Sequence, residues 1–380
     1  MKSSLILYKE GVWKGLDIDL KMKENAQCVL VFVDTTLLSS DFLYVSLKQH
    51  FTKASIVFCS TAGEIFQQDI EENSAVCMVM YFEKTNVLCA SGNIDLFEDA
   101  AALGKSVASS LLRDDLKHIL VLSDGNRING DLLVEGIYEA VGSTVKVSGG
   151  LAGDAVRFEK TLVGLDNDVA EGNIVLIGFY GNSIKIGTGF RGGWDVFGPE
   201  RIITKSKGNV LSEIDNSNAL DLYKLYLGKY ANELPSTALL FPLSVKYPGT
   251  DIFVVRTILS IDEQNKTMTF AGNMPKGSTV RFMKSNADRL ILAASEAGKE
   301  SVLGLDKSNI EAALVVSCIG RKIVLSDRAE EEVEAVLENF APETVVAGFF
   351  SYGEIAPYDN KKRSVLHNQT ITITTFSELP

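Results

Sequence analysis

The sequence predicts an α/β protein of two fused halves, in which mixed sheets are flanked by helices and a β-α-β-β module is repeated. The main observation is that an apolar strand, an amphipathic helix, a second strand and a turn closed by an acidic residue occur in this order three times, each followed by a further strand. The first two copies share one spacing, since Val29 precedes Glu64 by as many residues as Ile119 precedes Asp154. The chain has 380 residues, 46% of them hydrophobic and 23% charged, which is enough apolar material for more than one core.

Each element of the module follows from its residue types. The first strands are runs of aliphatic side chains, as in strands buried on both faces, and are predicted over residues 29–33, 119–123 and 313–317. The helices carry apolar residues at helical spacing and are predicted over residues 40–51, 130–141 and 328–340. Second strands are predicted over residues 56–59, 145–147 and 345–350, and the strands after the turns over residues 75–82, 173–180 and 369–376.

The stretch from residue 183 to residue 309 has a different character, because short strands alternate with turns there. Helices are predicted over residues 218–227 and 287–297. No Pro- or Ser-rich linker marks a domain boundary, and we place it near residue 220. This gives an N-terminal domain over residues 27–220 and a C-terminal domain over residues 221–378. The sequence leaves open whether residues 183–309 form a domain of their own.

The charge balance and the cysteines restrict the function and the compartment. With 37 basic and 49 acidic residues the net charge is −12, so a nucleic-acid backbone or an anionic membrane surface would be repelled. No apolar run approaches the roughly 18 residues that a membrane-spanning helix needs. The five cysteines are odd in number and have no C-x-x-C spacing, as is typical of structural thiols in a reducing compartment. We therefore expect a cytoplasmic protein that binds neither nucleic acid nor a membrane.

The repeated turns are the strongest indication of a binding site. In a single turn, glycine followed by an acid has an ordinary explanation, since glycine adopts a positive φ and the acid caps the next element. Three copies favour a functional role, because loops converge at the ends of strands in α/β sheets and ligands bind there. We expect Glu64, Asp154 and Glu354 to surround a shared hollow, where an arginine or an ammonium group of a ligand would offset their charge.

Six segments carry a resemblance to a known family. They are Cys59–Ile65, Ser123–Gly125, Gly149–Asp154, Ser317–Arg321, Gly348–Pro357 and Leu366–Thr370. In this order they resemble the FIST family of signal-transduction sensor domains, with its N-terminal and C-terminal halves, over residues 27–378. The resemblance implies a bacterial or archaeal sensory domain that binds small ligands such as amino acids and passes the bound state to a signalling partner. Since the match uses nearly the whole chain, we expect that partner to be a separate protein such as a histidine kinase.

The candidate ligand-binding residues come from these segments and the turns: Ser60, Thr61, Glu64, Asp124, Asp154, Arg321, Tyr352, Glu354, His367 and Asn368. Arg321 is the candidate for a ligand carboxylate, because a guanidinium group binds a carboxylate through two parallel hydrogen bonds. A pairing of Arg321 with Glu354 is equally consistent with the sequence. Tyr352 either covers a ligand or packs against its neighbours, and packing is the more ordinary role.

Two other functions have less support. Some FIST relatives are haem proteins that sense nitric oxide and regulate a histidine kinase. A haem iron here would need His50, His118 or His367 as its ligand, and because only the resemblance suggests it, we predict no cofactor and no metal site. A hydrolase would need a nucleophile and a base, such as Cys59 or Ser60 with His367, but the motif G-x-S-x-G is absent and we predict no enzymatic activity. The predicted function is a sensor for an amino acid or a related small polar metabolite.

Overall fold

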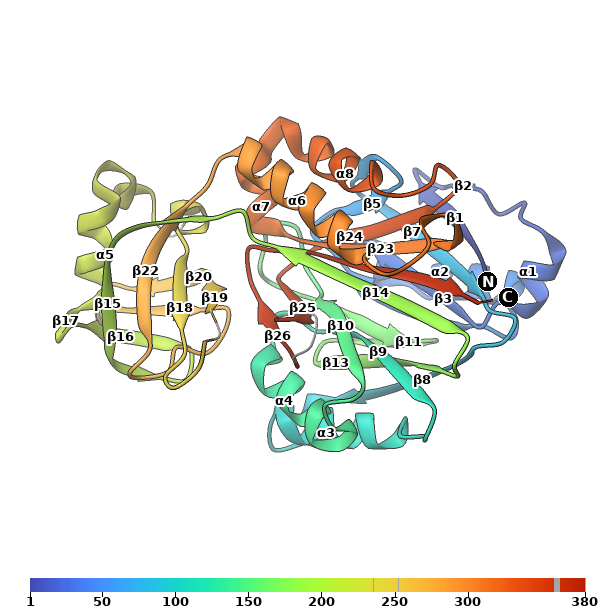
Figure 1. The fold of residues 1–380 in the computed structure, drawn as a ribbon, viewed down its shortest axis with the longest axis horizontal. Coiled ribbons are helices and arrows are strands. Elements are labelled where there is room, and N and C mark those ends of the chain that lie inside the picture. The colour runs from blue at the N-terminus through green and yellow to red at the C-terminus, as the bar shows by residue number, and fades with distance from the viewer. Residues whose placement is uncertain (235, 252, 359–362, 380) are drawn as a thin grey trace.

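The computed structural model describes residues 1–379 except residues 235, 252 and 359–362. Figure 1 shows a large body of sheets covered by helices, with a smaller lobe beside it. The two chain ends meet on the large body, where the Met1 amino group lies 3.0 Å from the Glu378 carboxylate. The mixed α/β fold predicted from the sequence is confirmed.

The large body, as far as the structure describes it, contains three modules of the predicted type. Module 1 consists of β1 (Lys2–Lys9), β3 (Cys28–Val33), α2 (Phe42–His50), β4 (Ser55–Ser60) and β7 (Ser74–Tyr81). Module 2 consists of β8 (Asn86–Asn93), α3 (Ala100–Ser110), β9 (Leu116–Ser123), α4 (Gly130–Val141), β10 (Lys146–Leu151) and β13 (Asn173–Tyr180). Module 3 consists of β14 (Ile184–Arg191), α6 (Ala287–Ser301), β23 (Ala312–Cys318), α7 (Ile319–Leu325), α8 (Ala329–Leu337), β24 (Val345–Ser351) and β27 (Ile371–Glu378).

The pairing of strands confirms that the modules are equivalent. In each of them the first and second strands run parallel, and the strand after the turn lies antiparallel on the other side of the first. The resulting orders across the sheets are β1-β7-β3-β4, β8-β13-β9-β10 and β14-β27-β23-β24. A backbone hydrogen bond at the end of each first strand repeats as well: Asp34 N to Ser74 O at 3.0 Å, Asp124 N to Asn173 O at 2.9 Å and Cys318 N to Thr370 O at 3.0 Å.

The strand that leaves each turn crosses to the sheet of another module. β5 (Glu64–Phe66) pairs with β24 of module 3, β11 (Val163–Leu165) pairs with β4 of module 1, and β25 (Gly353–Pro357) pairs with β10 of module 2. The turns themselves are joined in the same cyclic order by the backbone hydrogen bonds Ala62 N to Phe350 O, Gly153 N to Ser60 O and Tyr352 N to Leu151 O. The modules therefore form a closed ring, and the predicted convergence of the three turns follows from this exchange.

The helix predicted over residues 328–340 is α8, which begins within one residue of the predicted start and ends earlier, at Leu337, but a further helix, α7, precedes it and was not predicted. The helical conformation is interrupted between them at Ser326, which has a φ of 51°. α7 was missed because it follows β23 directly, and its first residue is preceded by Cys318, whose side chain makes no capping hydrogen bond. Short elements were also missed: β2 (Val12–Lys14), α1 (Leu20–Asn25), β6 (Asp69–Glu71), β12 (Asp168–Ala170) and β26 (Ser364–His367).

The smaller lobe is an insertion into module 3, between β14 and α6 (Figure 1). It consists of β15 (Asp195–Lys207), β16 (Val210–Ile214), β17 (Ser217–Asn218), α5 (Ala219–Leu227), β18 (Leu243–Lys246), β19 (Phe253–Arg256), β20 (Ile258–Asp262), β21 (Thr267–Phe270) and β22 (Thr279–Lys284), with a 3₁₀ helix at Ser236–Leu240. Its sheet encloses a hydrophobic core of its own, which includes Tyr223 and Phe282. Only the lobe within the stretch 183–309 is thus a separate unit, and the predicted boundary near residue 220 falls inside it, in α5.

A buried ion pair attaches the lobe to module 2. Arg256 in β19 is fully buried, and its guanidinium group donates to both carboxylate oxygens of Asp131 in α4, at 2.9 and 3.0 Å. The same side chain donates to the Leu366 carbonyl at 3.0 Å. Tyr247 and the Asn273 carbonyl in the lobe accept from Arg256 as well, so its desolvation is offset by partners from both the lobe and the body, which joins the two.

The central strands of the body are packed on both faces. Every residue of β3, β13, β23 and β27 is buried. The aliphatic runs of β3 and β23 indicated this, whereas the alternating sequence of β27, with its threonines, did not. The cysteines are free thiols, and Cys28, Cys59, Cys77 and Cys318 are buried. No helix in the described part of the chain combines the length and the apolar character that crossing a bilayer would take.

Candidate functional site

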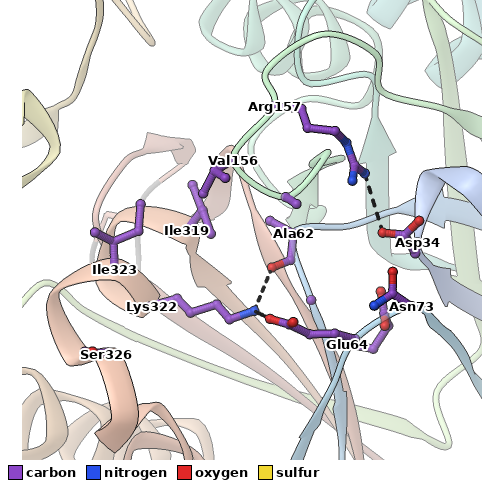
Figure 2. Close-up of a pocket in the computed structure, with 13 residues that line it drawn as sticks. Asp34, Ala62, Glu64, Asn73, Val156, Arg157, Ile319, Lys322, Ile323 and Ser326 are labelled. Atoms are coloured by element: carbon purple, nitrogen blue, oxygen red, sulfur yellow. Dashed lines mark hydrogen bonds and ion pairs between the residues drawn. The ribbon is translucent and has the colours of Figure 1, made fainter. Parts of the chain in front are cut away.

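A cavity of about 480 Å³ lies where the three modules meet (Figure 2). Module 1 contributes the residue after β3, the first turn and the residues before β7, module 2 contributes the loop after Asp154, and module 3 contributes α7. The lining residues are Asp34, Ala62, Gly63, Glu64, Glu72, Asn73, Ala155, Val156, Arg157, Ile319, Lys322, Ile323 and Ser326. Of the residues predicted from the sequence to bind ligand, Glu64 is the one in this lining.

Glu64 stands at the start of β5 with its carboxylate held by two hydroxyl groups. Thr61 Oγ1 donates to one oxygen, and Ser74 Oγ donates to the other at 2.6 Å. Only 1% of the side chain is exposed. Burial outweighs the two hydrogen bonds and raises the pKa of Glu64 to about 7. Near neutral pH this carboxyl group is therefore poised between its charged and neutral forms.

Asp34 and Asp154 hold Arg157 on one side of the cavity. Arg157 Nε donates to Asp154 Oδ1 at 2.6 Å, and its Nη2 lies 3.5 Å from Asp34 Oδ2. Asp154 is buried, which by itself would raise its pKa, but hydrogen bonds from Arg157 and from the Lys160 backbone amide outweigh burial and lower that pKa. Asp154 is therefore a permanent anion that fixes Arg157, while the longer Arg157–Asp34 contact faces the cavity (Figure 2).

Lys322 reaches into the cavity from α7 on the opposite side (Figure 2). Its Nζ donates to the Ala62 carbonyl at 3.1 Å and lies 2.7 Å from the Glu72 carboxylate. The ammonium group also lies over the Phe350 ring, 5.1 Å from its centroid. One helix of module 3 thus places a cation against the turn of module 1.

Arg321 is directed away from the cavity and is fully buried. Its Nε donates to Glu332 in α8 at 2.8 Å, and its Nη2 donates to the Leu290 carbonyl at 3.0 Å. Its Nη1 donates to the Gly192 carbonyl. The alternative in which Arg321 pairs with Glu354 is therefore wrong, because Glu332 is the partner. These contacts tie α6, α7 and α8 together.

Glu354 repeats the arrangement of Glu64 in module 3. Ser351 Oγ donates to one oxygen at 2.6 Å, and Thr370 donates to the other through its hydroxyl group at 2.7 Å and its backbone amide at 3.1 Å. Burial raises the pKa of Glu354 to about 7. Glu354 does not line the cavity. Of the three acids expected around a shared hollow, Glu64 faces it, Asp154 anchors Arg157 at its side, and Glu354 lies apart.

The other predicted residues support the turns. Ser60 Oγ donates to the Gly153 carbonyl at 2.8 Å, and Asp124 accepts from the backbone amides of Asn126, Arg127 and Gly172, each at 2.7 Å. Tyr352 stacks on Phe158 with the ring centroids 4.5 Å apart, and its hydroxyl donates to the Ala155 carbonyl at 3.2 Å. Tyr352 thereby holds the loop that carries Arg157.

His367 and Asn368 are buried beside β25 and outside the cavity lining. His367 Nε2 lies 3.3 Å from the Ala356 carbonyl, and burial lowers the pKa of His367 to about 3. The amide group of Asn368 has no hydrogen-bond partner among the described residues. Neither His50 nor His118 lines the cavity. In the part of the chain that the structure describes, no cluster of His, Cys, Asp and Glu side chains has the arrangement of a metal site.

The sequence did not predict the two cations of the cavity, Arg157 and Lys322, or two of its acids, Asp34 and Glu72. Asp34 had a usable signal, because it follows the first strand of module 1 as Asp124 follows that of module 2. Lys322 lies one residue beyond a segment that was singled out, but its direction depends on α7, which was not predicted. Arg157 had no signal of its own apart from its closeness to Asp154 in the sequence.

The chain is 21% identical over 394 aligned residues to an uncharacterized protein of Methanocaldococcus jannaschii, covering 92% of this chain and 74% of that protein. A crystal structure of a cyanuric acid hydrolase from A. caulinodans aligns over 94% of this chain and 91% of its own, at 10% identity and a TM-score of 0.36, which is too low to support an argument. The FIST N domain matches residues 27–217 and the FIST C domain matches residues 219–357. The chain therefore belongs to the FIST family, whose domains act in signal transduction as sensors that bind small ligands.

Proposed function

We propose that the protein is a sensor whose cavity binds a small zwitterionic metabolite, an amino acid or a close relative. The observation that supports this most is the distribution of charge on the cavity wall. The carboxylates Asp34, Glu64 and Glu72 come from module 1, whereas Arg157 comes from module 2 and Lys322 from module 3. A ligand with both signs of charge would complement this wall, and a volume of about 480 Å³ lies within the range of small-molecule pockets.

The ligand carboxylate would pair with Arg157. Arg157 is fixed by Asp154 and has only a 3.5 Å contact with Asp34, so its guanidinium group remains available for a charge-assisted pair. The ligand ammonium group would lie against Asp34 and Glu64. Its charge would favour the ionised form of Glu64, whose pKa is raised by burial to about 7. Binding would thus relieve part of the cost of the buried carboxylate.

Signalling would follow from the ligand bridging parts of different modules. α7 carries Lys322 on the cavity side and also contacts the 3₁₀ helix at Ser236–Leu240 in the lobe. A ligand that binds one arrangement of α7 more tightly by about 1–3 kcal/mol would shift the population of that arrangement. A separate signalling protein, such as a histidine kinase, would detect the shift. The proposal requires no cofactor and no catalytic activity.

A thermal-shift panel tests the proposal. Ligands that bind only the folded state raise the melting temperature, so the panel should contain amino acids and, for each one that stabilises, its N-acetyl derivative and its methyl ester. We expect the free amino acid to stabilise and both blocked forms to fail, because each lacks one of the two charges. Stabilisation by a blocked form as large as that by the free amino acid would contradict a zwitterion site. A purified protein with strong absorption at the violet end of the spectrum would replace the proposal with a haem sensor.

A further inference from the structure

A second hollow, of about 340 Å³, lies at the other end of the strands of module 2. The main cavity is at the carboxyl ends of β9 and β10, whereas this hollow is lined by residues at their amino ends and by residues 182–186 at the start of β14. It therefore lies between modules 2 and 3 and shares no lining residue with the main cavity. None of its residues belongs to the predicted ligand site.

Lysines dominate the wall of this hollow. Lys117, Lys146 and Lys185 all line it and are all exposed. Among the described residues none of the three forms an ion pair, although the chain carries a net charge of −12 and other exposed lysines, such as Lys21 and Lys105, pair with a carboxylate. Three unpaired ammonium groups around one hollow repel one another, and a bound anion would relieve that repulsion.

His118 supplies a second and independent indication of an anion. It lines the hollow, only 1% of it is exposed, and its Nε2 lies 2.8 Å from Ser148 Oγ. Ser148 Oγ in turn accepts a hydrogen bond from Thr374 Oγ1 at 2.8 Å. The Ser148 proton is then directed at Nε2, so the proton of the imidazole ring resides on Nδ1.

That Nδ1–H group is buried and has no acceptor among the described residues. The imidazole ring is neutral near pH 7, because burial and the nearby Lys146 lower the pKa of His118 to about 3. A buried donor without a partner is costly and uncommon in folded proteins. Beside three lysines, the group that would satisfy it is an anionic oxygen.

We propose that this hollow is a binding site for a phosphate-like oxyanion, which accepts hydrogen bonds from the ammonium groups of Lys146, Lys185 and Lys117, and from His118 Nδ1 once the side chains that cover this buried atom move aside. Free phosphate and the phosphate group of a small metabolite present the same chemistry to it. The site is independent of the main cavity and does not depend on the proposed sensor function. Because it joins modules 2 and 3, an anion bound there would stabilise the ring at a second point.

Isothermal titration calorimetry with inorganic phosphate and with glucose 6-phosphate tests the site, in chloride buffer at constant ionic strength. We expect phosphate to bind the wild type, and the double variant Lys146→Gln/Lys185→Gln to bind at least about tenfold more weakly, since two charge-assisted contacts are lost. Lys53→Gln is the matched control, because Lys53 is also exposed but lies outside the hollow, and it should bind as the wild type does. Since all the substituted lysines are exposed, the melting temperatures without phosphate should be alike.

Nuclear magnetic resonance of the imidazole nitrogens gives a readout of His118 itself. The chain has only three histidines, so the Nδ1 resonance of His118 can be assigned, and we expect phosphate to shift it in the wild type and not in the double variant. Tighter binding of glucose 6-phosphate than of phosphate would support the site and identify an esterified phosphate as its ligand. Failure of both compounds to bind, or equal binding by the double variant, would overturn the proposal.

Discussion

Replacement of Arg321 by methionine should destabilise the protein by about 3–5 kcal/mol, which is the cost of breaking a buried ion pair. Both Arg321 and Glu332 have fully buried side chains. Without the guanidinium group, the Glu332 carboxylate would keep only the hydrogen bond from Ser317 Oγ, at 2.7 Å, to offset its desolvation. The backbone carbonyls of Gly192 and Leu290 would lose a donor as well.

A double variant separates the two sources of this cost, which are the uncompensated Glu332 carboxylate and the unpaired backbone carbonyl groups. Arg321→Met/Glu332→Leu removes both charges and should recover about half of the lost stability, because the uncompensated carboxylate is gone while the two carbonyl groups remain unpaired. Urea unfolding of the wild type and the variants measures the free energies, and the dependence on urea should be unchanged. If Arg321→Met retained the wild-type stability and weakened ligand binding instead, the structural role assigned to Arg321 would be refuted and its predicted role in the ligand site would stand.

Further variants probe the ring, the lobe and the cavity. Gly149→Ala should prevent stable folding, because its φ is 145° and an added Cβ would lie 1.9 Å from the backbone carbonyl oxygen of Val121 in β9. Gly142→Ala is the control and should cost only about 1 kcal/mol, since its φ is 70° and no atom lies within 4 Å of an added Cβ. Soluble yield and urea midpoints distinguish the two variants, and equal effects would contradict the close approach of β9 and β10. Arg256→Met should cost about 3 kcal/mol, because Asp131 would lose its cation and keep the hydrogen bond from the Asn273 backbone amide. It should also expose the lobe connections to limited proteolysis, and a wild-type digestion pattern would argue against this ion pair as the lobe's attachment. Burial raises the pKa of Glu64 from 4.5 to about 7, so between these pH values the folded state binds a proton that the unfolded state has lost. The contribution of Glu64 to stability therefore falls as the pH rises from 4.5 to 7, by up to about 3 kcal/mol. The unfolding free energy of Glu64→Gln relative to that of the wild type should increase over this range, and a constant difference would refute the raised pKa.

The repeated module could be predicted from the sequence because its signals are local. The apolar runs of β3, β9 and β23 and the helical pattern of α4 identify their elements without knowledge of the rest of the chain, and α4 begins and ends at the predicted residues. The exchange of β5, β11 and β25 between modules could not be predicted, since it depends on pairing between distant segments and each of these strands is short. The insertion could be predicted only as a change of character over residues 183–309, a stretch that also includes β14 and α6 of module 3.

The sequence predicted the buried acids Glu64 and Asp154 of the candidate site and did not predict its cations Arg157 and Lys322. Repetition drew attention to Glu64 and Asp154, and both are buried at the turns where the modules meet. Arg157 and Lys322 are single residues on elements whose orientation is set by packing, so their sequence context does not distinguish them from surface cations. Arg321 shows the converse, since its neighbours in the sequence suggested a ligand role while its environment in three dimensions is a buried network.

The measurement that tests the central claim most directly is a calorimetric titration of the stabilising amino acid into the wild type, Arg157→Gln and Lys322→Gln. The account predicts that each variant binds about tenfold more weakly, since Arg157→Gln loses the charge-assisted contact to the ligand carboxylate and Lys322→Gln loses the second cation of the cavity wall. Arg113→Gln and Lys53→Gln are the matched controls, because both residues are exposed and lie away from the cavity, and they should bind as the wild type does. Dissociation constants of Arg157→Gln and Lys322→Gln equal to that of the wild type would contradict a ligand site between the modules.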